Sequence, residues 1–230
     1  MIRNNFSQDT WRDIDLVCFD VDGTLYDQRK LRLFMLREIL MEVSQTRKVN
    51  FIRILKIYRS LREKAIAYPN NFEQLLISET ANLAGCSENT VKDIITEWIH
   101  IRPLRYLDKC RYAGVIDLFS RLKSHGKKIG IFSDYPAENK IISLGLKADY
   151  IVYAGDKDTP RLKPDPQGLL NIMQMSGSGP ANTLLIGDRP ERDGIAARKA
   201  ESYVLLRSTK KYNDFQTFNR YTESIFSLNS

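Results

Sequence analysis

The sequence predicts an α/β fold, in which a parallel sheet is flanked by helices and interrupted by an all-helical insertion. Short runs of β-branched and apolar residues predict buried strands, most clearly at 16–22, 128–135 and 183–188. Two further runs, 150–155 and 202–207, predict additional strands. Helical segments separate these runs, which is the pattern of parallel strands joined by crossover helices.

The crossover helices are indicated by apolar residues at helical spacing. One such stripe comprises Val115, Leu118, Phe119 and Leu122 within 111–124. Three more segments have helical patterning, at 137–144, 166–175 and 191–200. In open parallel sheets, ligands bind outside the carboxyl ends of the strands. The polar residues that follow the predicted strands are therefore expected to converge on one site.

The stretch from about 31 to 105 breaks the strand and helix alternation, because it contains no convincing strand and reads as consecutive amphipathic helices. Ile54, Tyr58 and Leu61 share one face of a helix predicted over 50–64.

A later helix in this stretch is predicted to begin after Ser87, a residue type that favours the N-cap position. We therefore expect two domains. Residues 1–30 and 106–230 would form the α/β core, and residues 31–105 would form an all-helical cap.

Composition excludes a disordered chain, since 43% of the 230 residues are hydrophobic. The cysteines Cys18, Cys86 and Cys110 lie far apart without metal-ligand spacing, so reduced thiols are expected. The sequence lacks a run near the ~20 apolar residues that span a membrane, and its N-terminus has no signal-peptide pattern. A cytoplasmic protein with no membrane partner is expected, and its oligomeric state is not predicted.

Positive charge is concentrated in one part of the chain, which carries a net charge of +7. Residues 29–64, here called the basic stripe, hold eleven Lys or Arg residues and three Glu. Such a stripe can bind polyanions, concentrate a small anionic substrate, or form the solvated face of amphipathic helices. The sequence has no recognisable nucleic-acid-binding motif, so a nucleic-acid partner is not expected.

The strongest chemical signal is FDVDGTLYD at 19–27, where a hydrophobic strand ends in two aspartates. Asp20 and Asp22 are spaced i, i+2 and would share one face of a regular strand. Gly23 allows a sharp turn beside them. Two carboxylates this close are costly unless a cation or a shared proton compensates their charge.

This segment resembles the first motif of the haloacid dehalogenase superfamily, and three further motifs follow in the same order. The matching residues are Asp20, Asp22, Gly23 and Thr24 for the first motif, Ser133 for the second, Lys163 in RLKPDP for the third, and GDRPERD at 187–193 for the fourth. The resemblance implies a Rossmann-like core with a helical cap inserted after the first motif, as in phosphoglycolate phosphatase-like enzymes.

The resemblance also implies catalytic roles. Asp20 would be the nucleophile that forms an aspartyl phosphate. Asp22 would be the general acid and base. Lys163 would supply fixed positive charge, and the Ser133 hydroxyl would donate to phosphate oxygens with the following backbone N–H.

Substrate contacts are expected from the loops that follow the first two predicted strands, at Gly23, Thr24 and Asp134. Asp134 stands where this family often has a neutral Asn, so it brings another anion near the phosphate site unless its side chain turns away.

A magnesium site is expected at the same strand ends, because Mg²⁺ binds few carboxylates together with waters and a substrate phosphate oxygen. Its implied ligands are Asp20, the backbone carbonyl of Asp22 and the side chain of Asp188, with Asp193 holding a metal-bound water.

The implied activity is a Mg²⁺-dependent phosphatase that hydrolyses a small phosphorylated metabolite of the phosphoglycolate, nucleotide or sugar phosphate class. A sugar phosphomutase shares the Asp20 and Asp22 pair and remains an alternative. A haloacid dehalogenase ranks lower, because that branch lacks the second aspartate. From another class, a nucleic-acid-binding module could use the basic stripe, but such a module would have no use for a complete catalytic set.

Overall fold

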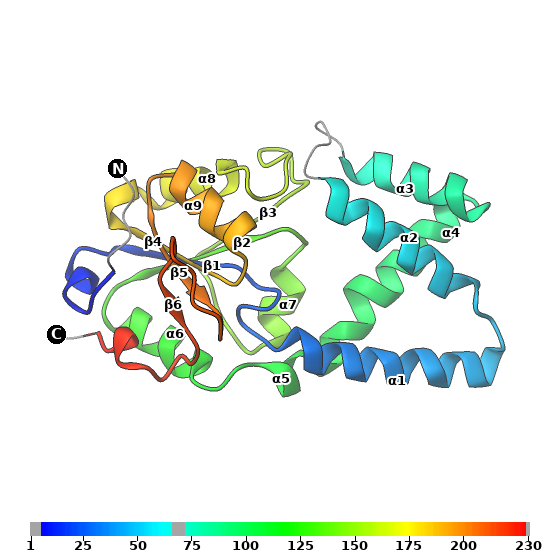
Figure 1. Ribbon diagram of the computed structural model, residues 1–230, viewed down its shortest axis with the longest axis horizontal. Helices are drawn as coiled ribbons and strands as arrows, with labels where there is room; N and C mark the ends of the chain where they lie inside the picture. The colour runs from blue at the N-terminus through cyan, green and yellow to red at the C-terminus, as the bar shows by residue number, and fades with distance from the viewer. Residues whose placement is uncertain (1–5, 66–71, 229–230) are drawn as a thin grey trace.

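The computed structural model describes residues 6–65 and 72–228, and it confirms a parallel sheet with an all-helical insertion (Figure 1). Within these residues the sheet has six strands in the order β3-β2-β1-β4-β5-β6, with every neighbouring pair parallel. The strands are β1 (Leu16–Phe19), β2 (Lys128–Ser133), β3 (Tyr150–Tyr153), β4 (Thr183–Gly187), β5 (Tyr203–Arg207) and β6 (Thr217–Phe218).

Helices cover both faces of the sheet. They are α6 (Val115–Ser124), α7 (Glu138–Ser143), α8 (Gln167–Ser176) and α9 (Ile195–Lys199). Figure 1 shows α8 and α9 on one face and α6 and α7 on the other. Short helical turns complete the core at η1 (Asp9–Arg12), η5 (Pro180–Asn182), η6 (Pro190–Gly194) and η7 (Ser224–Phe226). The result is a three-layer α/β/α core.

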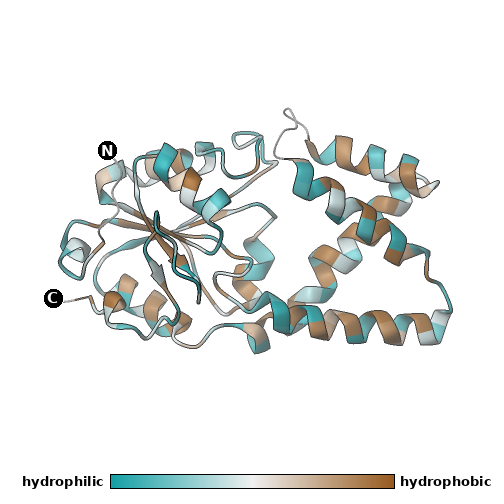
Figure 2. Cartoon of the chain, viewed as in Figure 1, coloured by the Kyte–Doolittle hydropathy of each residue, from teal (hydrophilic) through white to brown (hydrophobic). Residues whose placement is uncertain are grey.

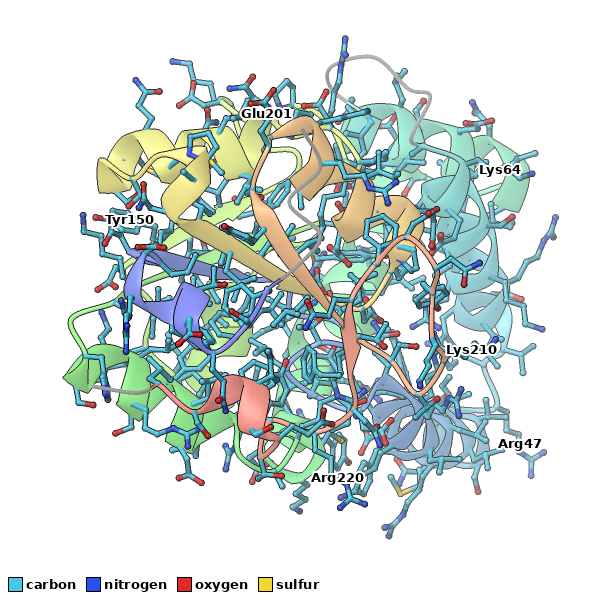
Figure 3. The ribbon with its side chains drawn as sticks, turned by 60° about the vertical axis from the view of Figure 1, so that its left-hand side comes forward. Arg47, Lys64, Tyr150, Glu201, Lys210 and Arg220 are labelled. Atoms are coloured by element: carbon cyan, nitrogen blue, oxygen red, sulfur yellow. The ribbon has the colours of Figure 1, made fainter. Side chains whose placement is uncertain are left out.

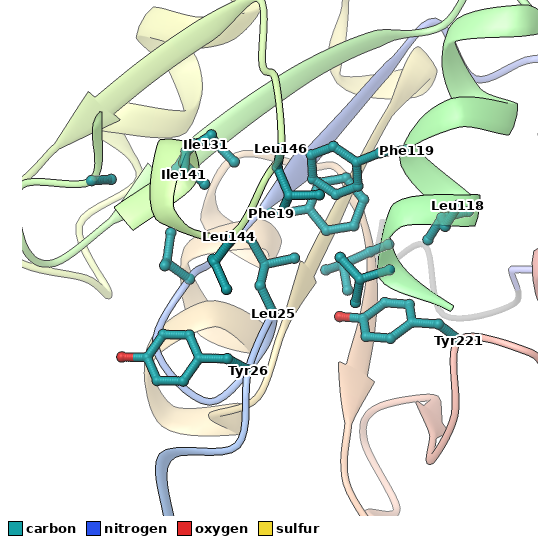
Figure 4. Close-up of a cluster of buried hydrophobic side chains, with 14 of the residues drawn as sticks. Phe19, Leu25, Tyr26, Leu118, Phe119, Ile131, Ile141, Leu144, Leu146 and Tyr221 are labelled. Carbon is teal, nitrogen blue, oxygen red and sulfur yellow. The ribbon is translucent and has the colours of Figure 1, made fainter. Parts of the chain in front are cut away.

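The two faces of the sheet are filled by alternate residues of each strand, as strand geometry requires. On β1, Val17 and Phe19 join the cluster under α6 and α7, whereas Leu16 and Cys18 join the cluster under α8 and α9. The rings of Phe19 and Phe119 lie 4.7 Å apart between their centroids (Figure 4). Apolar residues concentrate along the central strands, as Figure 2 shows.

In the residues that the structure describes, the insertion between β1 and β2 consists of helices joined by short connections. Its elements are α1 (Gln28–Thr46), α2 (Asn50–Lys64), α3 (Phe72–Ala84), α4 (Glu88–Ile95), η3 (Thr96–Ile101), η4 (Arg102–Tyr106) and α5 (Leu107–Cys110). Helices α1 to α4 lie at one end of the molecule, away from α6, α8 and α9 (Figure 1). The exact domain boundaries at 30/31 and 105/106 stay a prediction.

Capping residues explain where two helices of the insertion begin. Asp27 caps α1, because its side chain accepts hydrogen bonds from the backbone N–H groups of Arg29 and Lys30. Ser87 caps α4 as predicted and accepts from the N–H of Thr90 at 3.1 Å. Among the described helices, none has both the length and the apolarity needed to cross a membrane.

Three details differ from the sequence prediction. The helix predicted over 111–124 starts only at Val115, because Gly114 takes a left-handed conformation with φ 84°. The helix predicted over 191–200 is divided into the η6 turn and α9. Strand β6 was not predicted, since two residues carry no recognisable pattern.

A close approach between α8 and β2 gives a stability prediction. A Cβ atom on Gly168 would lie 2.3 Å from Cε2 of Phe132, a buried ring on β2. Gly168→Ala should therefore destabilise the fold by about 1–3 kcal/mol. For a chain of this size each kcal/mol lowers Tm by about 2–4 °C, which thermal unfolding would measure.

Gly179→Ala is the matched control, because the nearest atom to its added Cβ would be 3.8 Å away and its φ of −86° suits any residue. Its Tm should not fall and should rise by about 1–4 °C, since Gly→Ala at a compatible site stabilises by about 0.4–1 kcal/mol. Equal Tm values for the two variants would contradict the packing argument.

Candidate active site

The site begins where β1 ends. Asp20 follows the last strand residue, is 5% exposed, and its backbone N–H donates to the carbonyl of Ile186 on the neighbouring β4. The Thr24 hydroxyl donates to Asp20 Oδ2 at 2.9 Å. Between them Gly23 has φ 98°, and a Cβ there would lie 2.2 Å from Asp188 Oδ2. Glycine is thus required both by the backbone conformation and by the carboxylate that sits against it.

Lys163 is the buried cation that joins this loop to the fourth motif. Its Nζ donates to Asp20 Oδ1 at 2.5 Å and to Asp193 Oδ1 at 2.6 Å. It also donates to the carbonyl of Phe132, at 3.1 Å. Burial alone would lower the Lys163 pKa, but Asp193 and Asp20 outweigh burial and raise it, so the ammonium stays charged.

Three carboxylates form a cluster around this ammonium. Asp20, Asp188 and Asp193 each place one oxygen within 4.8 Å of the others. Asp188 Oδ1 is buried and has no hydrogen-bond partner among the described residues. Burial, with repulsion from Asp20 and Asp193, raises the pKa of Asp188 to about 8. Burial also raises the pKa of Asp20 to about 6, although Lys163 opposes it.

The cluster fits a divalent cation. A single ammonium cannot neutralise three carboxylates, and the unpaired oxygen of Asp188 is an available hard ligand. The structure therefore brings together Asp20 and Asp188, two of the predicted magnesium ligands. The third predicted ligand, the backbone carbonyl of Asp22, stays a prediction.

Asp193 holds the loop that carries Asp188 through backbone hydrogen bonds. Its Oδ2 accepts from the backbone N–H groups of Asp188 and Arg189, at 3.1 and 3.0 Å. Burial would raise its pKa, but Lys163 and the backbone donors outweigh burial and lower it. These bonds tie the η6 turn to the end of β4. The predicted role of Asp193 in holding a metal-bound water stays a prediction.

Asp22 lies beside the cluster but pairs with a different cation. Lys140 on α7 places its Nζ 2.7 Å from both carboxylate oxygens of Asp22. The Tyr26 hydroxyl donates to Asp22 Oδ1. Burial would raise the Asp22 pKa, but the interactions with Lys140 and Tyr26 lower it.

Ser133 ends β2, the strand adjacent to β1, and is fully buried. Its Oγ accepts from the backbone N–H of Tyr135 at 3.1 Å, which leaves the hydroxyl proton available for donation. The carbonyl of the preceding residue, Phe132, accepts from Lys163. Lys163 thus connects the ends of β1 and β2.

The charge of Asp134 is compensated by two arginines. Its Oδ1 accepts from the backbone N–H of Lys163 at 2.9 Å. Its Oδ2 accepts from Arg192 at 3.0 Å and from Arg189 at 3.3 Å. The sequence predicted another anion near the phosphate site unless this side chain turned away, and the structure gives it two guanidinium partners. Its predicted contact with substrate stays a prediction.

Two residues at the end of α2 connect the helical insertion to this network. Arg62 donates to the backbone carbonyl of Asp134 at 2.6 Å, and its guanidinium carbon lies 3.9 Å from the ring centroid of Tyr135. Glu63 forms ion pairs with Arg192 at 3.2 Å and Arg189 at 3.8 Å. The insertion therefore touches the core directly beside the second and fourth motifs.

The basic stripe divides into two kinds of residue. Ten of its eleven cations are exposed, and Figure 3 shows Arg47 and Lys64 projecting outward from the helical insertion. Arg62 is buried, with 3% of its surface exposed, and also pairs with Glu73 and the Tyr58 hydroxyl. The exposed majority fits the solvated-face interpretation, and Arg62 has a separate structural role.

Sequence reasoning missed Arg62 and Lys140, although patterns for both exist. Arg62 follows Tyr58 by four residues and so falls on the apolar face of α2. Lys140 lies three residues after Ala137 and next to Ile141, on the buried face of α7. A cation on an apolar helix face indicates a buried partner for its charge. That the partner of Lys140 is Asp22 is seen only in the tertiary structure.

Comparisons with known proteins show which proteins this chain resembles. A family model described as haloacid dehalogenase-like hydrolase matches residues 14–201. A glyceraldehyde 3-phosphate phosphatase of Methanopyrus kandleri is 24% identical over 217 residues, covering 90% of this chain and 89% of that protein. Phosphoglycolate phosphatase 1 of Pseudomonas aeruginosa is 31% identical over 107 residues, covering 44% of this chain and 38% of that protein.

The fold also resembles that of solved structures. A 2-haloacid dehalogenase from Pseudomonas syringae pv. Tomato DC3000 superimposes with a TM-score of 0.66 at 17% identity, covering 90% of this chain and 95% of that chain. The family model spans most of the sequence and includes all four motifs. The chain therefore belongs to the haloacid dehalogenase-like hydrolases.

Proposed function

We propose that this chain is a Mg²⁺-dependent phosphatase that transfers a phosphoryl group from a small metabolite to Asp20 and then to water. The observation that supports it most strongly is the environment of Asp20. This carboxylate is buried, fixed by Lys163 and Thr24, and adjacent to the unpaired oxygen of Asp188. A nucleophile that is held in place and has its charge balanced is what phosphoryl transfer needs.

The reaction would proceed in two steps. A carboxylate oxygen of Asp20 forms a bond to phosphorus while the bond to the leaving oxygen breaks. Asp22, whose lowered pKa keeps it ionised in the resting site, must first take up a proton from solvent and then gives it to that oxygen. A water molecule, deprotonated by Asp22, then attacks the phosphorus and releases Asp20 and inorganic phosphate. Lys163 balances the charge that moves between Asp20 and the phosphoryl oxygens.

Other contacts would orient the phosphoryl group. The Ser133 hydroxyl has a proton to donate, and the backbone N–H of Asp134 follows it at the same strand end. The loop formed by Gly23 and Thr24 would lie against the other side of the group.

The magnesium ion would be held by Asp20, Asp188 and the backbone carbonyl of Asp22, with Asp193 supporting its shell. When bound, it supplies positive charge that draws the substrate phosphate toward the nucleophile and offsets the repulsion between the carboxylates. The unpaired Asp188 oxygen supports this assignment from within the structure.

The substrate class follows from the family and from the helical insertion. Relatives named as phosphatases of glyceraldehyde 3-phosphate and phosphoglycolate point to a small phosphorylated metabolite. Residues 31–105 would act as a cap that excludes bulk water during the reaction. Its contacts through Arg62 and Glu63 support that role. The cytoplasmic location expected from the sequence stays a prediction.

A sugar phosphomutase and a nucleic-acid-binding module are the competing functions. Release of inorganic phosphate, rather than an isomerised sugar phosphate, separates the phosphatase from the mutase. A p-nitrophenyl phosphate assay with Mg²⁺ and with chelator should show turnover only with the metal. Tight binding in a gel shift that weakens steeply between about 50 and 200 mM salt, without turnover, would instead favour the nucleic-acid module.

Asp20 and Asp22 should act in different ways, which kinetics can separate. With Asp22→Ala, an alkyl phosphate should lose about 10²–10⁴-fold in turnover, the usual contribution of a positioned acid or base. A p-nitrophenyl leaving group needs no proton, so phosphorylation of Asp20 should continue while hydrolysis of the aspartyl phosphate slows. Rapid mixing should show a nitrophenol burst near one equivalent of enzyme.

Asp20→Asn is the control and should show neither turnover nor burst. Equal slowing of both substrates by Asp22→Ala, without a burst, would mean that Asp22 supports the loop or the metal rather than moving protons.

The carboxylate cluster should make the metal-free protein less stable as pH rises. The pKa of Asp188 is raised to about 8, so the stability it contributes is greatest below about pH 4 and is lost as pH rises to about 8. In chelator, Asp188→Asn should therefore have a higher Tm than the unsubstituted chain, by a margin that grows from pH 5 to 8 and then levels off.

Added Mg²⁺ should raise the Tm of the unsubstituted chain at pH 8 more than that of Asp188→Asn, because ligands that bind the native state stabilise it. Asp117→Asn, an exposed substitution on α6, should leave both profiles unchanged. Identical pH profiles for Asp188→Asn and the unsubstituted chain would contradict the described cluster.

A further inference from the structure

Lys140 is a buried lysine that none of the four motifs includes. It lies on α7, seven residues after Ser133, and is 8% exposed. Lysine is almost never buried this deeply without a partner. Its partner is Asp22, to which it is bonded through both carboxylate oxygens at 2.7 Å.

The contacts fix the orientation of the Asp22 carboxylate. Its Oδ1 accepts from both Lys140 and the Tyr26 hydroxyl, whereas Oδ2 accepts from Lys140 alone among the described residues. A carboxylate oxygen can accept about two hydrogen bonds. Oδ1 is therefore filled, and Oδ2 keeps room for one more partner.

Lys140 is itself held on two sides. Its neighbour Ile141 packs in the main core cluster, which anchors α7. Its Nζ lies 5.0 Å from the ring centroid of Tyr135, and Arg62 of the helical insertion lies 3.9 Å from the same ring centroid. Tyr26 is anchored in turn, since its ring belongs to that core cluster, as Figure 4 shows. Both donors to Asp22 are thus fixed by packing.

We propose that Lys140 is a positioning residue for the phosphatase reaction: it holds the Asp22 carboxylate so that Oδ2 is the oxygen that exchanges a proton with the leaving group and with water. This assignment rests on the proposed function. Without Lys140, Asp22 would keep the Tyr26 bond to Oδ1 but lose the donor that Oδ2 shares with it. Lys163, another cation near Asp22, already serves Asp20 and Asp193. The position of Oδ2 would then be less fixed.

Lys140→Met tests the assignment, because it keeps the length of the side chain and removes the donor. We expect kcat for an alkyl phosphate to fall about 10- to 100-fold, part of what a positioned acid or base contributes, with KM changed less than about threefold. The nitrophenol burst rate with p-nitrophenyl phosphate should change little. Lys140→Arg should recover part of kcat.

A double-mutant cycle with Asp22→Asn makes the test specific. If Lys140 acts through Asp22, adding Lys140→Met to Asp22→Asn should cause no further loss of kcat. Lys147→Met is the matched control, since Lys147 is an exposed lysine that follows α7, and it should match the unsubstituted chain. Thermal unfolding of each variant would show that it is folded.

Three results would overturn the assignment. A raised KM with unchanged kcat would make Lys140 a substrate-binding cation. A full additional loss in the Asp22→Asn background would make its action independent of Asp22. Equal kcat in Lys140→Met and the unsubstituted chain would leave it no role in the reaction. Failure of the proposed function can be told apart from failure of the Lys140 assignment, because the unsubstituted chain itself would then release no phosphate from any ester. In that case the Lys140 assignment would be wrong as well.

Discussion

The buried ammonium of Lys163 is the interaction on which the rest of the site depends. It bonds to Asp20 after β1, to Asp193 in the η6 turn and to the Phe132 carbonyl on β2. A buried charge is tolerated only when it is paired and hydrogen-bonded, and breaking such a pair costs about 3–5 kcal/mol. One side chain thus holds together three segments that are far apart in the sequence.

The same network leaves a surplus of negative charge. Asp188 has a buried oxygen without a partner in the described chain, beside two carboxylates that already share Lys163. The metal-free cluster therefore carries electrostatic strain, and the proposed divalent cation would relieve it. Strain of this kind is typical of sites where pKa values are perturbed for chemistry.

Much of the core, and the candidate residues that meet at its strand ends, could be predicted because the signals are local. The strands stand out as apolar runs, and with β1 between β2 and β4 the ends of three strands meet at one edge of the sheet. Ser87 was recognisable as an N-cap, and the Asp20 and Asp22 pair as a carboxylate site. These features depend on residue type and spacing alone.

The remaining features depend on tertiary contacts whose partners no local pattern identifies. The partners of Asp134 are arginines 55 and 58 residues away, and Lys140 lies 118 residues from Asp22. Arg62 could not be separated from the exposed cations of the basic stripe by charge, only by its place on the apolar face of α2. Sequence therefore indicated which candidate residues meet at the site, but not the groups that orient them.

The central claim is that Asp20 itself becomes phosphorylated, and chemical trapping tests it most directly. Acid quenching during turnover, followed by borohydride reduction, converts an aspartyl phosphate to homoserine. Peptide mass spectrometry should find homoserine at position 20, dependent on both substrate and Mg²⁺ and absent from Asp20→Asn. Turnover without any modified aspartate, or with the modification at another residue, would contradict the account.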